Sequence, residues 1–204
     1  NQINFENFGS NDFFADIEII NLASKLLKNL LPNSKITLHI NSLGSRDDLK
    51  NYKKILSKYY NDYKNLLSPE SVEKINTNPL RILDSKNIKD REVINKSPKL
   101  IELISKSDLS LYEEIKKCLK DINIQFVEDP TLVRGLDYYC HTVFEFKTNE
   151  IGTQDTLIGG GRYDGLIKTL GGSDIPGVGW AGGIERIMLL MQNLPFDKQN
   201  IHLA

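Results

Sequence analysis

The sequence LVRGLDYYCHTVFEF, residues 132–146, combines an Arg and an Asp with paired tyrosines in a stretch whose other positions suit a buried strand. Gly135 favours a β-bulge within that strand. A buried Arg134 needs an anionic partner, because leaving it unpaired costs several kcal/mol. Two interpretations stay open: an internal ion pair with Asp137 or Glu145, or a guanidinium held ready for a substrate carboxylate or phosphate.

The segments around this stretch predict a sheet flanked by helices. Residues 1–10, NQINFENFGS, alternate as a half-buried strand, with Gln2, Asn4 and Glu6 on one face and Ile3 and Phe5 on the other. A helix with apolar residues every third or fourth position follows, and ITLHIN predicts a second strand. Strands return with IQFVED and DTLIGGGRYDGLI, and a glycine-rich turn then leads into a final helix. An antiparallel α+β fold is the economical assignment.

Residues 45–124 predict a mostly helical insertion. Leu49, Tyr52, Leu56, Tyr59, Tyr63 and Leu67 repeat at helical spacing, which is typical of a core-facing stripe, with RNA stacking as the alternative. Ser68-Pro69 and Ser97-Pro98 each have the form of a helix cap followed by Pro at the first helical position. A further helix over residues 111–120 is expected to return the chain to the sheet.

Charge and cysteine content exclude several classes of protein. The net charge of -1 argues against a protein that coats nucleic acid, although residues 45–125 hold 17 Lys and Arg against 13 Asp and Glu. That excess is more often a solvated face than a binding patch. The two cysteines, Cys118 and Cys140, are too few for a disulfide framework. Cys140 and His141 are neighbours in a predicted strand, so we expect them on opposite faces and expect no metal site there.

The sequence shows no recognisable membrane span or signal peptide. No apolar run approaches the roughly 20 residues that span a bilayer, and the start does not resemble a signal peptide. We therefore expect a cytoplasmic protein without a membrane partner. The chain begins in mid-strand without Met, which predicts that it is a piece of a longer polypeptide.

Two glycine-rich motifs are candidates for ligand contact. GGGRYDGL, residues 159–166, permits close approach of a ligand, but a tight turn is the simpler interpretation, and the GK[ST] ending of a P-loop is absent. In GWAGGIERI, residues 179–187, the small residues allow a flat ligand to lie against a helix start. Arg186 could hold a phosphate or stack on a purine; alternatively, it pairs with Glu185 or solvent while the glycines serve helix packing.

The order of these motifs carries a family resemblance. LVRGLDYY with TVFEF, then GGGRYDGL, then GWAGGIERIMLL, all after QINFENFG, resembles histidyl-tRNA synthetases, which are class II aminoacyl-tRNA synthetases. The first two look like the two signature motifs of that family and the third like class II motif 3. NPLRILDSK, residues 78–86, looks like the insertion domain of the bacterial-type enzymes.

The resemblance implies activation of histidine with ATP and transfer of the histidyl group to tRNA(His). It implies that Arg134 binds both the histidine carboxylate and the ATP α-phosphate and acts in catalysis by offsetting their charge. It implies that histidine is bound by Gln2, Glu6, Tyr138, Tyr139 and Tyr163. It implies that ATP is bound by Arg186, Gly182 and Gly183 in addition to Arg134. Mg²⁺ would arrive with ATP as substrate, with no tightly bound cofactor and no protein metal site, and the full-length protein would be a homodimer.

The resemblance also marks departures. Motif 1 and the start of motif 2 should lie upstream of Asn1, so the chain by itself is expected to be inactive. The implied division is a catalytic part over 1–44, the insertion over 45–124, a catalytic part with the signature motifs over 125–195, and a linker to an anticodon-binding domain from 196–204. The rival reading is a non-catalytic regulatory paralogue acting in histidine biosynthesis, which would be expected to lose Arg134 and the signature tyrosines. A second rival is a non-catalytic module that binds uncharged tRNA as a sensor. The cue for it would be an attached kinase or other domain, and none is visible in the sequence.

Overall fold

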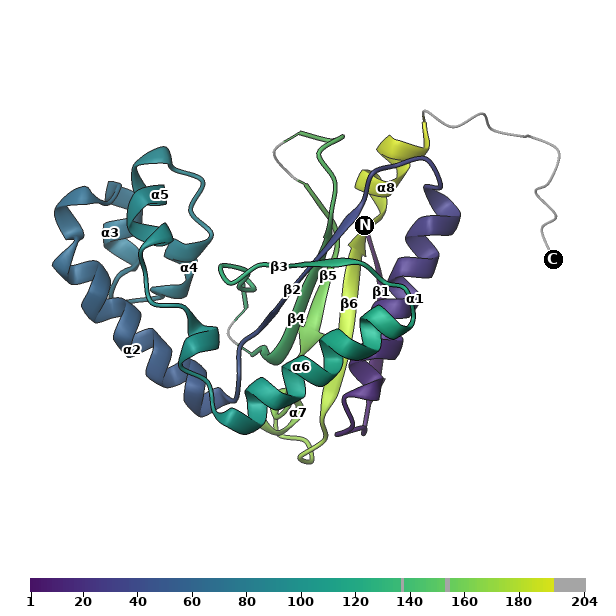
Figure 1. Cartoon of the computed structure of the whole chain (residues 1–204), viewed down its shortest axis with the longest axis horizontal. Helices are drawn as coiled ribbons and strands as arrows, with labels where there is room; N and C mark the ends of the chain where they lie inside the picture. Colours follow the sequence, from purple (N-terminus) through teal and green to yellow (C-terminus); the bar gives the residue numbers. More distant parts are fainter. Residues whose placement is uncertain (137, 153–154, 193–204) are drawn as a thin grey trace, which may run out of the picture.

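The centre of the molecule is a six-stranded sheet of order β1-β6-β5-β4-β2-β3 (Figure 1). The computed structural model describes residues 1–136, 138–152 and 155–192. All neighbouring strands pair antiparallel except β2 and β3, which are parallel. The predicted α+β fold with a sheet flanked by helices is confirmed, with a parallel edge pair added. The strands are β1 Gln2–Phe8, β2 Thr37–Ser42, β3 Phe126–Glu128, β4 Cys140–Lys147, β5 Thr156–Arg162 and β6 Gly177–Gly183.

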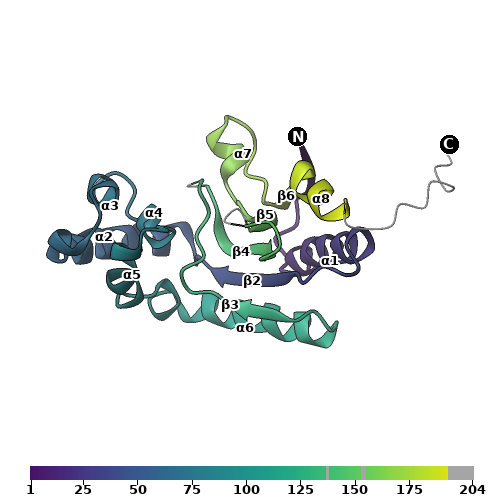
Figure 2. The same cartoon turned by 90° about the horizontal axis from the view of Figure 1, so that it is seen from above.

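Helices α1, Phe14–Leu30, and α6, Lys106–Asp121, share a core with the sheet. The N-cap residue of α1 is Phe13, which has no side-chain cap, and the Asp12 carboxylate before it accepts a hydrogen bond from the Phe14 backbone N at 3.0 Å. Apolar residues of both helices pack against Ile40, Phe144 and Ile158 of the strands, and those side chains are fully buried. These two helices therefore leave the opposite face of the sheet to other elements, as the view from above shows (Figure 2).

A second core lies beside the sheet, among the helices at the left of Figure 1. Leu49, Tyr52 and Leu56 of its longest helix are buried, which confirms the core interpretation for this part of the stripe. Tyr63 is 42 % exposed, because the helix ends at Asp62 and the stripe loses its period there. The elements are α2 Arg46–Asp62, η1 Lys64–Leu66, α3 Pro69–Lys74, α4 Leu80–Leu83, α5 Ile88–Asn95 and η2 Leu100–Glu102.

The two Ser-Pro pairs behave differently. Ser68 caps α3 with Pro69 at its first position, as predicted. Ser97 does not begin a helix: its hydroxyl donates to the Ile94 carbonyl at 2.7 Å, so it closes α5 instead, and the following 3-10 turn starts only at Leu100.

Three expectations about the strands are wrong. Residues 132–136, 138 and 139, the described part of that stretch, form no strand, and β4 begins at Cys140. The predicted turn at 177–183 is strand β6, whereas the glycines 159–161 lie within β5, as the strand predicted over DTLIGGGRYDGLI implies, and the turn of GGGRYDGL falls at residues 164–165. A Cβ on Gly160 would overlap the Gly179 carbonyl and the Trp180 side chain, so the close pairing of β5 with β6 requires glycine here. Ile3 and Phe5 of the edge strand β1 stay exposed, by 41 % and 45 %, so β1 is not half-buried.

The expected opposite orientation of Cys140 and His141 is also wrong. The register of β4 against β5 shifts between Cys140 and Val143, and His141 has φ 49°. Because this bulge breaks the alternation of the strand, ligand-type atoms of Cys140, His141 and Asp164 lie within 4.8 Å of one another.

A buried ion pair fixes the end of β5. Arg162 donates from Nε to the Asp16 carboxylate of α1, with Nε to Oδ2 at 3.0 Å, and a second bond runs from Nη2. Its Nη1 also donates to the Ser10 carbonyl at 3.0 Å. Burial alone would lower the pKa of Arg162, but these carboxylate contacts raise it, so the guanidinium remains charged. Within the described ranges, no helix is both long and apolar enough to cross a membrane.

Candidate active site

Two adjoining pockets open on the sheet face that α1 and α6 leave uncovered. We call the first the tyrosine pocket, with a volume of about 410 Å³, and the second the arginine pocket, with a volume of about 680 Å³. Gln2 and Ala181 line both. The predicted residues in the tyrosine pocket are Gln2, Glu6, Tyr138, Tyr139 and Tyr163. Those in the arginine pocket are Arg134, Gly183 and Arg186.

A carboxylate and a phenol define one wall of the tyrosine pocket. The Tyr163 hydroxyl donates a hydrogen bond to Oε2 of Glu6. Burial raises the pKa of Tyr163, and the hydrogen bond and charge of Glu6 raise it further. The phenol is therefore neutral and acts as the donor. A Cβ on Gly179 would overlap the Glu6 carboxylate, so β6 must carry glycine where it passes beneath Glu6.

Three aromatic rings form the rest of this pocket. Tyr138 and Tyr139 have ring centroids 4.6 Å apart, and Tyr163 meets both edge-on, at 5.9 Å and 6.2 Å. Edge-to-face packing of this kind holds rings in fixed orientations. Burial raises the pKa of Tyr139 although the nearby Arg134 charge opposes this. The pocket thus combines phenol hydroxyls with one carboxyl group, a set suited to a small ligand with ring N–H groups.

Arg134 lines the arginine pocket and lies beside Tyr139, which lines the tyrosine pocket. Its Nη1 pairs with the Glu145 carboxylate of β4, and its guanidinium carbon lies 5.7 Å from the centre of the Tyr139 ring. A Cβ on Gly159 would overlap the guanidinium, which explains a glycine in the middle of β5. Nε of Arg134 is buried without a hydrogen-bond partner among the described residues. The ion pair that the sequence suggested is present, and the same side chain lines the arginine pocket.

Arg186 lies in the first turn of α8, Ile184–Met191, at the far side of the arginine pocket. Its Nη1 donates to the Thr156 carbonyl at 2.6 Å. The Thr156 hydroxyl donates in turn to Oε2 of Glu145 at 3.1 Å. Arg186 therefore connects through β5 to the carboxylate that holds Arg134.

Gly182 is the predicted site residue that the pockets do not include. It pairs with Ile3 of β1, and a Cβ built on it would point at Ile158 and Ile3 on the other face of the sheet. Its neighbour Ala181, which sequence reasoning did not assign, faces both pockets instead. Asn4 also lines the tyrosine pocket, and the alternation of Gln2, Asn4 and Glu6 carried that signal.

Comparison with known proteins identifies a family for this chain. A family profile described as Histidyl-tRNA synthetase matches residues 1–187. Histidine--tRNA ligase of Wolbachia pipientis is 45 % identical over 202 residues, covering 99 % of this chain and 50 % of that protein. The enzyme of the same name from Rippkaea orientalis is 44 % identical over 206 residues, covering 100 % of this chain and 48 % of its own.

Solved structures share the fold of this chain. The chain superposes on apo histidyl-tRNA synthetase of S. aureus with a TM-score of 0.74 and 29 % identity, covering 96 % of this chain and 48 % of that one. A Bacillus halodurans structure described as an ATP phosphoribosyltransferase regulatory subunit/histidyl-tRNA synthetase shares the fold, with a TM-score of 0.60 and 23 % identity over 96 % of this chain and 53 % of that one. The chain spans about half the length of the curated relatives it matches. With the family profile matched over most of its residues, the chain belongs to the histidyl-tRNA synthetase family.

Proposed function

We propose that the protein is a histidine-tRNA ligase, which activates histidine with ATP and transfers it to tRNA(His). One observation supports this most directly. The tyrosine pocket suits an imidazole, the arginine pocket suits a nucleotide phosphate, and the two share Gln2 and Ala181, with Arg134 of the arginine pocket beside Tyr139 of the tyrosine pocket. Two substrates bound side by side in this way can react without further movement of either.

The tyrosine pocket is proposed to hold histidine. Glu6 would accept a hydrogen bond from one ring N–H, and Tyr163 would keep that carboxylate in position. Gln2, between the two pockets, is placed for the α-amino group. Tyr138 and Tyr139 would pack against the imidazole ring and supply hydroxyls for its second nitrogen.

Arg134 is proposed to act on the charge of the reaction. A histidine carboxylate oxygen attacks the α-phosphorus of ATP, the bond to the bridging oxygen breaks, and pyrophosphate leaves. The attacking carboxylate and the phosphate are both anions, so a fixed guanidinium offsets their repulsion and the charge of the transition state. Glu145 would hold Arg134 in place before the substrates arrive.

The arginine pocket is proposed to hold ATP with its Mg²⁺ as substrate. Arg186 and the backbone near Gly183 line it, and the α8 start contributes amide N–H groups. Gly182 remains part of the proposal only through its backbone, because a Cβ at this position would point to the opposite face of the sheet from the pockets. In the second step, a terminal ribose hydroxyl of tRNA(His) attacks the histidyl carbonyl, and AMP leaves.

The remaining proposals concern the whole protein. We propose a cytoplasmic homodimer, of which residues 1–44 and 125–195 form catalytic parts and 45–124 an insertion domain. The linker proposed at 196–204 lies outside the described residues. The rival, a regulatory paralogue in histidine biosynthesis, would be expected to have lost Arg134, Tyr139, Tyr163 and Arg186, all of which are present.

The first test is histidine-dependent ATP-pyrophosphate exchange by the full-length polypeptide. We expect exchange that requires histidine and falls by about 10²–10³ in Arg134→Ala, as for loss of a fixed transition-state donor. Arg134→Lys should recover part of the rate, since a Lys keeps the charge and loses the fork. Folded protein that shows no exchange would favour the regulatory paralogue and reduce Arg134 to a structural ion pair.

A further inference from the structure

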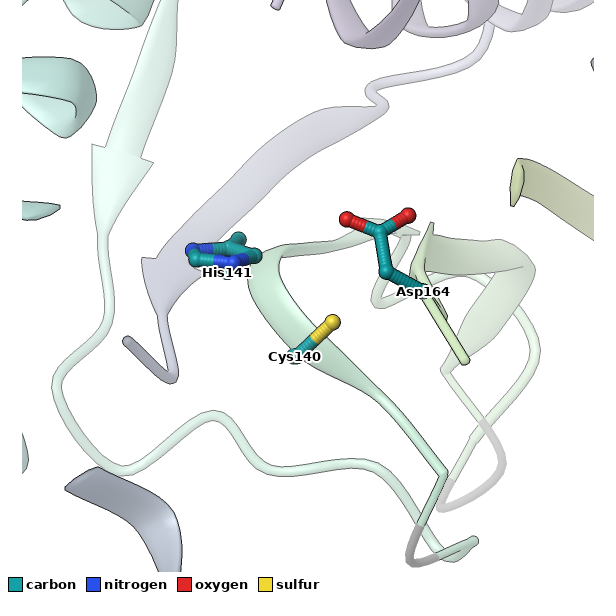
Figure 3. A group of neighbouring side chains, drawn as sticks. All are labelled: Cys140, His141 and Asp164. Carbon is teal, nitrogen blue, oxygen red and sulfur yellow. The ribbon is translucent and has the colours of Figure 1, made fainter. Parts of the chain in front are cut away.

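A group of three ligand-type side chains lies outside both pockets. Cys140 and His141 at the start of β4 meet Asp164, which follows β5, and one ligand atom of each lies within 4.8 Å of the others. Figure 3 shows the Cys140 sulfur directed toward Asp164. The residues that line the tyrosine and arginine pockets include none of these three.

The backbone at His141 is held in the conformation that brings the group together. His141 has φ 49°, in the left-handed region that costs a non-glycine residue about 1–3 kcal/mol. Its backbone N donates to the Gly44 carbonyl at 2.7 Å, and its own carbonyl accepts from Leu43 N at 2.7 Å. A regular strand would send Cys140 and His141 to opposite faces; this bulge places both beside Asp164.

The ligand atoms of Asp164 and His141 retain lone pairs that can bind a metal ion. Oδ1 of Asp164 accepts from Nη1 of Arg162 at 3.3 Å and from Gly177 N at 3.1 Å. Oδ2 of Asp164 takes part in no hydrogen bond with the described residues. Nδ1 of His141 lies 3.2 Å from Oδ1 of Asp108, within ion-pair distance although outside hydrogen-bond geometry. Metal-bound histidines commonly give their second ring N–H to such a carboxylate.

We propose that Cys140, His141 and Asp164 bind one Zn²⁺ ion, with water in the fourth position. Thiolate, imidazole and carboxylate are zinc donors, with bonds of about 2.3 Å to sulfur and about 2.0–2.2 Å to nitrogen and oxygen. Because the three ligand atoms lie no more than 4.8 Å apart, modest rotations of their side chains bring them to a common ion. One thiolate and one carboxylate also neutralise the charge of the ion.

Zinc uptake releases a proton. Burial raises the pKa of the Cys140 thiol to about 12, and the charge of Asp164 acts in the same direction. The thiol therefore carries its hydrogen in the free protein. As the sulfur-zinc bond forms, the S–H bond breaks and the proton passes to solvent, so the apparent affinity rises with pH.

The site would be coupled to the tyrosine pocket. Cys140 directly follows Tyr139, and Asp164 directly follows Tyr163, two rings that meet at 6.2 Å. An ion that joins the two segments fixes the separation of these tyrosines, and such preorganisation favours ligand binding. This consequence rests on the proposed function, whereas metal binding does not.

The test is metal titration of full-length protein stripped with a chelator. We expect one equivalent of Zn²⁺ to bind, and Co²⁺ in its place to give a thiolate-to-cobalt charge-transfer band. Cys140→Ser should abolish the band, and His141→Asn and Asp164→Asn should each weaken zinc binding at least tenfold. Cys118→Ser, which changes the other cysteine on α6, is the matched control and should keep the band.

The wild-type spectrum decides the proposal even where a variant fails to fold. Absence of a thiolate-to-cobalt band in the wild-type protein, or a band that persists in Cys140→Ser, would overturn the site. Bound zinc is also expected to lower the KM for histidine in pyrophosphate exchange severalfold. An unchanged KM with zinc bound would remove the link to the tyrosine pocket, and loss of exchange in all forms would instead contradict the proposed function.

Discussion

The Tyr163 hydroxyl donates to the Glu6 carboxylate and thereby joins β1 to the residue that follows β5. The two residues are 157 positions apart, and β6 with its glycine at position 179 passes between their strands. This contact fixes one oxygen of Glu6 and leaves the other for a ligand. The specificity of the tyrosine pocket should therefore depend on a phenol that need not touch the reacting atoms.

Tyr163→Phe tests this dependence. The variant keeps the ring but removes the donor, and a buried partner left without its hydrogen bond costs about 1–3 kcal/mol. We expect the KM for histidine to rise by roughly 5–150-fold, while the KM for ATP stays near the wild-type value. Tyr63→Phe, on the exposed end of the α2 stripe, should change neither parameter. Equal effects on both substrates would show that Tyr163 supports folding rather than histidine.

The Arg162–Asp16 pair predicts a stability effect. The two side chains are 5 % and 1 % exposed, so Asp16→Asn removes the nearer charge partner of a buried guanidinium and leaves only Asp164, at 3.3 Å and 32 % exposed. We expect the free energy of unfolding to fall by about 3–5 kcal/mol, measured by urea denaturation. Lys168→Ala breaks the Lys168–Asp174 pair, whose side chains are 65 % and 63 % exposed, and should cost less than about 1 kcal/mol. Similar losses in the two variants would contradict the distinction.

Asp90 predicts a pH-dependent contribution to stability. Although burial alone would raise its pKa, hydrogen bonds from Ser71, Ser85 and Ser68 bring the pKa below its usual value. A carboxyl with a depressed folded pKa stabilises the protein above its unfolded pKa of about 3.9, and this stability is lost as pH falls through the folded value.

The variant that isolates this effect is Asp90→Asn. We expect it to lower the free energy of unfolding by about 1–3 kcal/mol at neutral pH, with the difference from wild type shrinking below pH about 4. Urea denaturation across pH measures both. Asp62→Asn, an exposed aspartate at the end of α2, serves as the control and should show no such trend. A difference that does not change with pH would exclude the carboxylate as its source.

The charged face of α2 predicts a contribution to tRNA binding. Lys53, Lys54 and Lys58 lie on this helix, and the last two are exposed. Replacing all three by Ala should weaken tRNA affinity and flatten its dependence on salt, because each phosphate contact releases counterions. The charge-matched control replaces Lys25, Lys28 and Lys35, which are exposed on α1 and the loop after it. Equal binding by both triple variants at low salt would refute the contribution.

Sequence patterns predicted the regular parts of this fold and much of the site. Alternation in residues 1–10 placed Gln2 and Glu6 on one face, and the structure brings both into the tyrosine pocket. Ser45 begins α2 where the helical stripe begins, with a capping box to Asp48. Such features depend on neighbours within a few residues, so the local pattern contains the information.

Long-range contacts explain where the patterns failed. The glycine pattern of β6 predicted a turn, and that of β5 left a turn open, because the contacts that require glycine come from other elements: Arg134 packs over Gly159, and Glu6 over Gly179. The left-handed backbone at His141 depends on hydrogen bonds to Gly44 and Leu43, about a hundred residues earlier. No local pattern contains these partners.

The chain enters and leaves the helical unit over residues 45–104 at adjacent points. A Cβ on Gly44, just before α2, would lie 2.7 Å from the Ile104 side chain, just before α6, so the chain leaves and re-enters the sheet layer at adjacent points. A short loop from Gly44 to Ser105 would still let α6 carry the chain from β2 to the parallel β3. The helical unit can thus change in length during evolution without altering the strand order, provided that it keeps the apolar residues that pack against Tyr139 and Tyr163.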